Sequence, residues 1–396
     1  MKLILPLLLC GLLPCHAQQT QKPWQVPADF AAPDQKSVDM FAWQAFVALN
    51  WPAKEGVRGE PDTDKKIGDS GSTVWETFKT TDQIFLSGAK DPGPWNPAEK
   101  LKANAFAHRK MFSTSKISPA LLGKLPELAT QKLGGVQEAV GGTLTDQNGN
   151  LTYFERSTNE LGYDYIRSNQ FYNADVLAKA SEVDFPDSTV NIKAAWKILE
   201  AKDPVDKFYT TTASINGEDK TMGLVGLHIV VKTPNAPQWV WATFEHVSNA
   251  PTFSNLGEGP YSYNNPECPP AKCPPNQSTE VDGKPTGKPT QVVREVTIYE
   301  SAQNANQAWQ KALQGTVWKN YELVGTQWPT VPNNPSLPTG RPQPTLLGNT
   351  TMETYIQRES SCLQCHSTAH SEADLRYDFS FYLMAAQKPD KNEENK

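Results

Sequence analysis

The chain has 396 residues and a formal net charge of −6, and its basic residues form no stripe of the kind that binds nucleic acid. No apolar run after residue 17 is long enough to span a bilayer, so we expect no integral membrane segment in the mature chain. The length suffices for a large core, as one big domain or two moderate ones, and 11 Trp and 15 Phe supply much of it.

Residues 1–17 have the pattern of a secretory signal peptide. Lys2 supplies the positive charge, residues 3–13 are apolar, and Ala17 ends a small-residue cleavage pattern. No small residue precedes Cys10 or Cys15, which argues against a lipid anchor. We therefore expect export and a mature protein that begins near Gln18.

The first half of the mature chain predicts helices and then a hairpin. Apolar residues at helical spacing indicate a helix over residues 37–51, which Pro52 ends. A second helix is expected over residues 99–113. The Asn148-Gly149 pair predicts a hairpin between residues 142–144 and 151–154, and a helix follows over residues 159–169.

The second half of the body predicts an antiparallel sheet. Alternating apolar residues indicate a strand over 190–196. Runs rich in residues that favour β-strands indicate three more strands. A helix is expected after the last of them. The body, residues 18–328, is therefore predicted to be an α+β fold, with an antiparallel sheet flanked by helices. The three further strands and the helix are 224–231, 239–247, 292–299 and 302–313.

Three segments are predicted to follow the body. Residues 329–345 are rich in Pro and predict an extended strap that carries the chain across the surface to a new location. Residues 346–387 predict a short helical segment, in which a capping box at residues 350–353 starts a helix and residues 374–386 form the last one. Residues 388–396 are charged and predict a disordered tail.

The most specific motif is Cys362-Leu363-Gln364-Cys365-His366, which has the C-x-x-C-H spacing of a covalent c-type haem. Two thiols about one helical turn apart can form the two thioether bonds, and His366 is then the proximal iron ligand. The alternatives are a disulfide, a redox dithiol, or half of a zinc site. Haem attachment to this motif and a cleaved leader both indicate a bacterial periplasm. We expect one haem c, covalently bound.

The remaining mature cysteines, Cys268 and Cys273, lie in a Pro-rich loop and are expected to form a local disulfide in an oxidising compartment. The rival is a four-cysteine zinc site that uses both pairs. That site would leave His366 unexplained.

The second axial ligand is the main open choice. Only thirty residues follow His366, so the body must supply most of the pocket. The order of preference is His246, His228 and Met384, and then an open site. Each His can instead be held by hydrogen bonds in the core, and the Met can simply pack. His370 is discounted, because on a continued helix it shares a face with His366, whereas axial ligands approach iron from opposite sides.

Other side chains near the motif have possible roles in the pocket. Arg358, Arg376 and Tyr377 are candidates for binding the haem propionates, against the alternative of solvated surface groups. Trp239 and Trp241 either form a wall of the pocket or fill the far face of the sheet.

Four segments carry a resemblance to a known family: Phe41-Ala42-Trp43-Gln44-Ala45-Phe46-Val47-Ala48-Leu49-Asn50-Trp51-Pro52, Trp239-Val240-Trp241-Ala242-Thr243-Phe244-Glu245-His246-Val247, Gly325-Thr326-Gln327-Trp328-Pro329 and Ser361-Cys362-Leu363-Gln364-Cys365-His366. The chain resembles an uncharacterised family of exported, Trp-rich bacterial proteins with a C-terminal C-x-x-C-H, labelled cytochrome c family. The likeness spans most of the mature chain. It supports haem and export and implies no substrate.

The sequence thus predicts a periplasmic monohaem c-type cytochrome that transfers single electrons to a partner protein. The alternatives are a haem-dependent oxidoreductase of peroxidase or oxidase type, which needs an exchangeable distal site, and a haem-bearing sensor or binding protein. The last would explain a body much larger than electron transfer requires.

Overall fold

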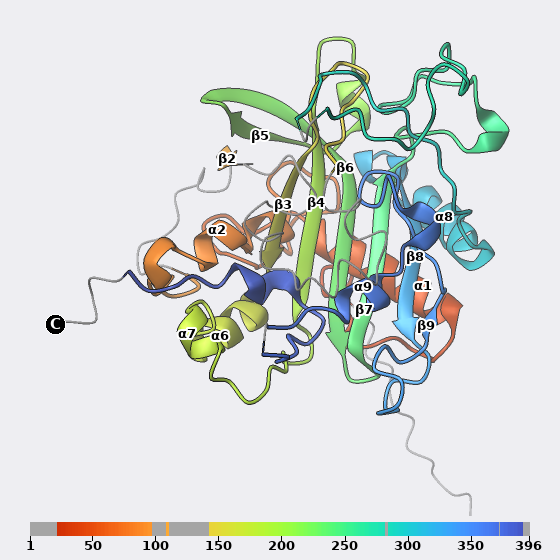
Figure 1. Cartoon of the computed structure of the whole chain (residues 1–396). Coiled ribbons are helices and arrows are strands. Elements are labelled where there is room, and N and C mark those ends of the chain that lie inside the picture. The colour runs from red at the N-terminus through yellow and green to blue at the C-terminus, as the bar shows by residue number, and fades with distance from the viewer. Residues whose placement is uncertain (1–21, 97–107, 111–141, 282–283, 372, 391–396) are drawn as a thin grey trace, which may run out of the picture.

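The computed structural model describes residues 22–96, 108–110, 142–281, 284–371 and 373–390. A large antiparallel sheet forms the centre of the molecule, and helices cover it on both faces, with α1 behind it and α9 in front of it in the view of Figure 1. Among the described residues, no helix is both long and apolar enough to cross a membrane. The antiparallel sheet and its flanking helices confirm the mixed α+β fold class.

The sheet has the strand order β1-β3-β4-β6-β7-β8-β9, with β5 paired to β6. These eight strands are antiparallel, and β2 adds to β5 in parallel. The strands are β1 (Lys79–Thr80), β2 (His108–Lys110), β3 (Tyr153–Thr158), β4 (Val190–Ile198), β5 (Thr210–Ile215), β6 (Glu218–Thr233), β7 (Ala236–His246), β8 (Tyr321–Pro329) and β9 (Pro342–Gln343).

Polar side chains cap the N-termini of α1 and α6. Asp34 caps α1, since its carboxylate accepts a hydrogen bond from the Ser37 N–H at 2.9 Å, and Asn159 caps α6 in the same way. The helices of the described residues are α1 (Gln35–Leu49), α2 (Thr81–Ile84), α6 (Glu160–Ser168), α7 (Ala174–Leu177), α8 (Glu300–Ala312) and α9 (Cys362–His366). The helices expected over 37–51, 159–169 and 302–313 are thus confirmed, to within about two residues at each end.

The two faces of the sheet differ in chemistry. Ile192, Ile229 and Ala242 lie opposite one another on β4, β6 and β7, on the face that α1 and α8 cover. They belong to the main core, which includes apolar side chains from both faces of the sheet. Successive side chains of a strand point to opposite faces, so the next row, which contains Lys193 and His228, lies on the other face. That face carries the C-terminal segment.

A buried amide fastens the helical layer to the sheet. The Trp43 indole N–H of α1 donates to the Asn306 side-chain oxygen of α8 at 3.0 Å, and the Asn306 amide donates to the Leu323 carbonyl of β8 at 2.9 Å. All the polar groups of this link are buried and paired, which sets the position of α1 and α8 on the sheet.

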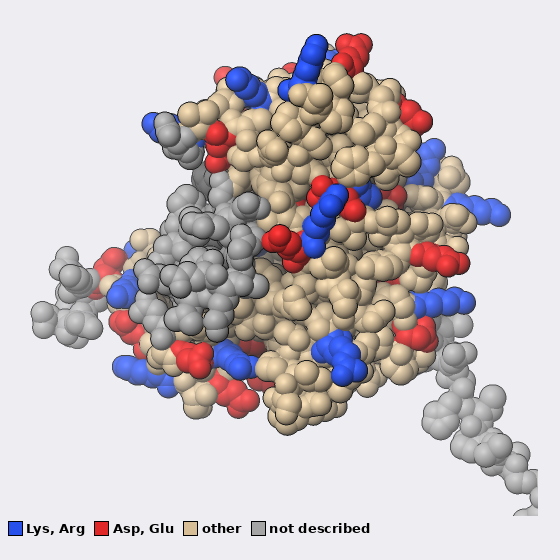
Figure 2. All heavy atoms as spheres, turned by 45° about the vertical axis from the view of Figure 1, so that its right-hand side comes forward, with Lys and Arg blue, Asp and Glu red and all other residues tan. Residues whose placement is uncertain are grey.

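The surface has charges of both signs. On the face shown in Figure 2, Lys and Arg side chains alternate with Asp and Glu, and the described residues there form no broad area of one sign.

The strand expected over residues 292–299 is wrong. The segment makes one isolated bridge, from Arg294 to Thr252, because side-chain amides occupy its backbone groups. Asn276 and Gln357 both donate to the Val293 carbonyl, at 2.9 and 3.0 Å. The central strand β8, which the sequence reading did not include, takes its place in the sheet beside β7.

The Pro-rich strap also differs from expectation. It does not carry the chain to a distant place, because β9 pairs back onto the end of β8, with Gln343 opposite Trp328. The Val331 N–H donates to the Gly340 carbonyl at 2.8 Å within the same loop. The two ends of the strap therefore lie side by side.

Two helices expected near the C-terminus do not form. The Asn349 side chain accepts the Thr351 and Met352 N–H groups, which gives turns in place of a helix over residues 350–353. In residues 374–386, Asp378 and Phe379 have left-handed φ values of 49° and 61°, and only Phe381–Ala385 forms a 3-10 helix.

Some predicted segments lie outside the described residues. These are the signal peptide, the end of the tail at 391–396 and most of the helix expected over 99–113. Of that last segment the structure describes residues 108–110, which form β2 and not a helix.

A buried ion pair fixes the start of the C-terminal segment to β7. Glu245, 1% exposed, accepts the Thr350 N–H at 2.8 Å and the Thr350 hydroxyl at 2.9 Å, and it pairs with Arg294. Arg294 also lies 3.1 Å from Glu322 on β8. The Asn349 amide donates to the Thr243 hydroxyl at 2.9 Å, so that the segment enters over the polar face of the sheet.

The substitution Arg294→Met is expected to lower the free energy of unfolding by about 3–5 kcal/mol, because it leaves the Glu245 carboxylate buried without its cation. The matched control is Arg358→Met, since Arg358 is exposed and lies 3.4 Å from Glu295. Its effect should stay below about 1 kcal/mol. Urea unfolding followed by Trp fluorescence measures both. Equal losses in the two variants would contradict the assigned role of the buried pair.

Candidate functional site

Helix α9 carries the C-x-x-C-H motif and lies against β7 and β8. The Ser361 hydroxyl caps the helix by accepting the Gln364 N–H, and the buried Gln327 amide oxygen of β8 accepts the Leu363 N–H at 2.8 Å. Leu363 is fully buried in the main core. These contacts hold the short helix on the sheet. Cys362 directly precedes the anchored Leu363, and Cys365 follows it by two residues.

The two thiols of the motif are free in the structure and lack the electrostatics of a redox pair. Burial raises the pKa of Cys365 to about 11, and the Glu353 carboxylate nearby acts in the same direction. Burial also raises the pKa of Cys362 well above its usual value. A reactive C-x-x-C dithiol has a lowered thiol pKa, so this environment argues against a redox dithiol.

His366 is held as a neutral imidazole with one free nitrogen. Burial lowers its pKa to about 3. Its Nδ1 lies 2.8 Å from the Phe379 carbonyl oxygen, and because a carbonyl only accepts, Nδ1 carries the proton and Nε2 the lone pair. The ring lies against Trp241 and Phe381, with centroid distances of 4.2 and 4.9 Å. This is the tautomer and the fixed orientation that a metal-binding His requires.

A strained loop positions the carbonyl that holds His366. Asp378 and Phe379 are both left-handed. The Trp239 indole donates to the Asp378 carbonyl at 3.0 Å, and the Asp378 carboxylate lies 2.7 Å from the Lys232 ammonium. The same carboxylate accepts the Phe185 N–H at 2.9 Å. Three hydrogen bonds to one residue therefore keep the loop in its strained conformation.

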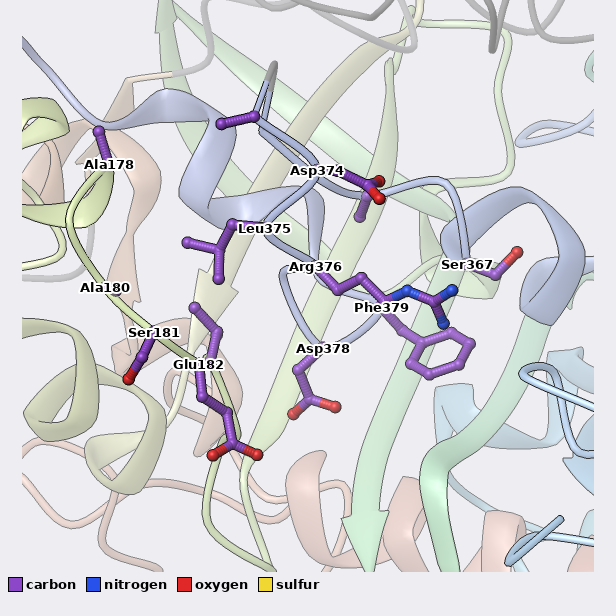
Figure 3. Close-up of a pocket in the computed structure, with 13 residues that line it drawn as sticks. Ala178, Ala180, Ser181, Glu182, Ser367, Asp374, Leu375, Arg376, Asp378 and Phe379 are labelled. Carbon is purple, nitrogen blue, oxygen red and sulfur yellow. The ribbon is translucent and has the colours of Figure 1, made fainter. Parts of the chain in front are cut away.

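A cleft of about 670 Å³ opens beside this loop. Figure 3 shows Glu182 from the segment after α7 on one side, with Asp378 and Phe379 on the other. The Arg376 side chain extends toward Phe379 and Ser367 in this cleft. Arg376, one of the predicted propionate ligands, thus lines the cleft.

A row of polar side chains crosses the sheet beneath the C-terminal segment. Arg156 of β3 is paired with Lys193 of β4, and Lys193 with His228 of β6, so the three side chains share one face. The His228 Nε2 atom is buried and makes no hydrogen bond to a described residue. Its nearest partner is the Glu353 carboxylate at 3.6 Å, which is beyond hydrogen-bond distance.

The row and the motif share one electrostatic environment. Lys193 and His228 lower the pKa of His366 in addition to burial, while Glu353 raises it. Burial raises the pKa of Glu353, but its His228 and Lys193 neighbours more than offset this and keep the carboxyl ionised. The structure therefore brings His228, Lys193 and Glu353 together with Cys365 and His366.

His246, the first choice for a second axial ligand, lies elsewhere. Its Nε2 lies 3.0 Å from the Lys207 carbonyl, and its Nδ1 accepts the Ser248 N–H at 3.2 Å. The ring stacks on Phe208 at 4.1 Å, and burial lowers its pKa to about 4. With both nitrogens occupied by protein groups, His246 has no atom to offer to a metal, and the preference passes to His228.

The other candidates near the motif have structural surroundings. Met384 is buried in the main core. His370 forms an isolated antiparallel bridge with Arg376, and its Nδ1 lies 2.8 Å from the Ser371 carbonyl. Arg358 is exposed, and Tyr377 is buried. Trp239 supports the strained loop and Trp241 contacts His366, so both face the C-terminal segment.

Cys268 and Cys273 are joined by a disulfide, with their Cα atoms 5.9 Å apart. They cannot share a zinc ion with Cys362 and Cys365. The described residues contain no group of three or more His, Cys, Asp and Glu side chains placed to hold a metal ion. The disulfide leaves Cys268 and Cys273 without a free thiolate for the four-cysteine zinc alternative.

Sequence reasoning missed Gln327, Lys193 and Glu353. A fully buried Gln within the apolar strand β8 was the available signal for the first. Lys193 alternates with apolar residues, so that it looks like a solvent-facing strand position. Comparison of the chain with protein-family models, curated proteins and solved structures finds no match.

The variant Lys232→Met is expected to be destabilised in a pH-dependent way. Burial raises the pKa of Asp378 to about 6, above its unfolded value, and Lys232 is the buried cation beside it. Lys232 holds the Asp378 pKa down, so in the variant this pKa lies above 6. At higher pH the variant leaves an unpaired buried carboxylate, at a cost of about 3–5 kcal/mol. The carboxyl becomes protonated as the pH falls through the raised pKa, so the loss should be smaller at pH 5 than at pH 8. Urea unfolding at pH 8 and pH 5 measures this difference.

The double variant Lys232→Met with Asp378→Asn serves as the control, because it removes both charges. It should be more stable than Lys232→Met at pH 8. A loss of equal size at both pH values would show that the ion pair is not the origin of the effect.

Proposed function

We propose that the chain is a monohaem c-type cytochrome, with the haem joined to Cys362 and Cys365 and with His366 as the proximal iron ligand. One observation carries the proposal. Beside two unbridged thiols of C-x-x-C-H spacing, His366 is neutral, its Nδ1 donates to the Phe379 carbonyl, and its Nε2 keeps a lone pair. Such a second-shell carbonyl fixes the ring orientation and raises the basicity of the ligand.

The donor groups of the site fit a haem. His228 presents a buried Nε2 atom without a hydrogen bond to a described residue, and it lies on the sheet face that the motif covers. A metal bond is one way to satisfy such an atom. We propose His228 as the second axial ligand, in place of His246. The haem supplies a centre that gains and loses one electron.

We further propose single-electron transfer with a periplasmic partner protein as the role of the chain. The leader of residues 1–17 supports export, and the disulfide between Cys268 and Cys273 fits an oxidising compartment. The fixed surroundings of His366 support electron transfer, because a rigid site needs little rearrangement when the charge of the iron changes.

A specific observation supports a second candidate, a haem-dependent oxidoreductase. Glu353 lies 3.6 Å from the His228 Nε2, and Lys193 lies beside both. A carboxylate that holds His228 away from the iron would leave the distal position open and give it an acid–base pair. The two candidates differ in whether an external ligand can reach the iron.

The mature protein is expected to carry one haem that denaturation does not release. Intact-mass measurement under denaturing conditions tests this, because two thioether bonds keep the haem on the chain. Cys362→Ala with Cys365→Ala should lose the haem mass. The matched control, Cys268→Ala with Cys273→Ala, should keep it. A colourless wild-type protein, expressed with a haem c maturation system, would overturn the haem assignment.

The second axial ligand can be assigned by carbon monoxide binding to the reduced protein. The wild type should be low-spin and unreactive, and His228→Ala should bind carbon monoxide rapidly. His246→Ala is the control and should behave as the wild type, since both nitrogens of His246 bond to protein. Rapid binding by the wild type would favour the oxidoreductase over the electron carrier.

A further inference from the structure

The polar row on the sheet runs in one direction away from the C-x-x-C-H helix. Helix α9 lies over β7 and β8, and β6, β4 and β3 follow outward with His228, Lys193 and Arg156. Neighbouring strands are about 4.8 Å apart. Lys193 is thus about one strand spacing and Arg156 about two strand spacings beyond His228.

The strand register fixes this order. Lys193 is directly opposite His228 on β6. Arg156 is opposite Lys193 on β3, one strand farther from the motif. The Lys193 ammonium lies 5.5 Å from the centroid of the Phe154 ring, which limits its freedom.

Both cations lie half-buried on the covered face of the sheet. This partial burial lowers the pKa of Lys193 to about 8 and also lowers the pKa of Arg156. Buried cations are stabilised by an anion within hydrogen-bond reach. Glu353 is a carboxylate near Lys193, but its own closest basic partner is His228. The site therefore favours a ligand that brings further negative charge.

A haem c has such charges at a fixed place. Its two propionates lie on the edge of the porphyrin across the ring from the edge that carries the thioether bonds. A haem joined to Cys362 and Cys365 and held by His228 would turn its propionate edge toward β4 and β3. We infer that Lys193 and Arg156 form a carboxylate-binding site that holds the haem propionates, an inference that rests on the proposed haem c.

This assignment replaces the arginines expected from the sequence. Arg358 is exposed and lies beside Glu295, and Arg376 lines the cleft shown in Figure 3. Neither belongs to the row that crosses the sheet. Arg156 and Lys193 are distant in sequence from the motif, and only the pairing of β3, β4 and β6 places them beside it.

The test uses the haem-loaded, full-length mature protein and the variants Lys193→Met and Arg156→Gln. Loss of a cation beside the propionates favours the more positive ferric haem and lowers the midpoint potential. The expected change in the ratio of oxidised to reduced haem is about tenfold for each variant, or about 59 mV for one electron. Resonance Raman bands of propionate bending should shift in both variants.

Two further variants keep the test decisive. Lys193→Arg retains the charge and should keep a potential close to that of the wild type. Arg358→Gln removes an exposed cation off the row and should leave both the potential and the Raman bands unchanged. Measurements on the haem-loaded fraction alone exclude chains that failed to fold.

The outcomes separate this inference from the proposed function. A haem-loaded wild type whose potential and propionate bands are the same in Lys193→Met and Arg156→Gln would overturn the propionate site and leave the haem c assignment intact. A wild type that takes up no haem would overturn the haem c assignment itself, and the propionate site with it.

Discussion

The alternation of side chains along the paired strands β4, β6 and β7 determines how the rest of the molecule is arranged. One face of these strands presents Ile192, Ile229 and Ala242 to α1 and α8. The same geometry turns Lys193 and His228 to the opposite face, where burial would cost free energy unless polar partners covered them. The C-terminal segment provides that cover, with hydrogen bonds to the sheet from Asn349 and Thr350 and with buried apolar side chains such as Leu363.

Those hydrogen bonds place a short helix with high precision. A helix of five residues has little stability of its own, so α9 depends on Gln327, Ser361 and the buried Leu363 for its position. His366 then depends on a carbonyl from a loop that is itself held by Trp239 and Asp378. The orientation of the His366 imidazole thus depends on β7, β8 and the loop at Asp378, which are far apart in the sequence.

The sequence predicted the fold class, three helices and the strands β4, β6 and β7 well, because their apolar periods are regular. It could not choose between His228 and His246. Both lie in apolar strands, and only the register shows that His228 pairs with Thr243 and faces the C-terminal segment, whereas His246 is held at the end of β7 by Lys207 and Ser248. The helical spacing in residues 374–386 was overridden by tertiary hydrogen bonds at Asp378, a competition that periodicity does not register.

The anchoring of Leu363 has a consequence for the order of maturation. Leu363 lies between the two cysteines and is fully buried against the sheet, so the thiols on either side of it are in place only when α9 has docked. Under the haem c proposal, the undocked segment presents both sulfur atoms free of the sheet. Attachment would then precede docking, and α9 would close onto the sheet with the cofactor already on the chain.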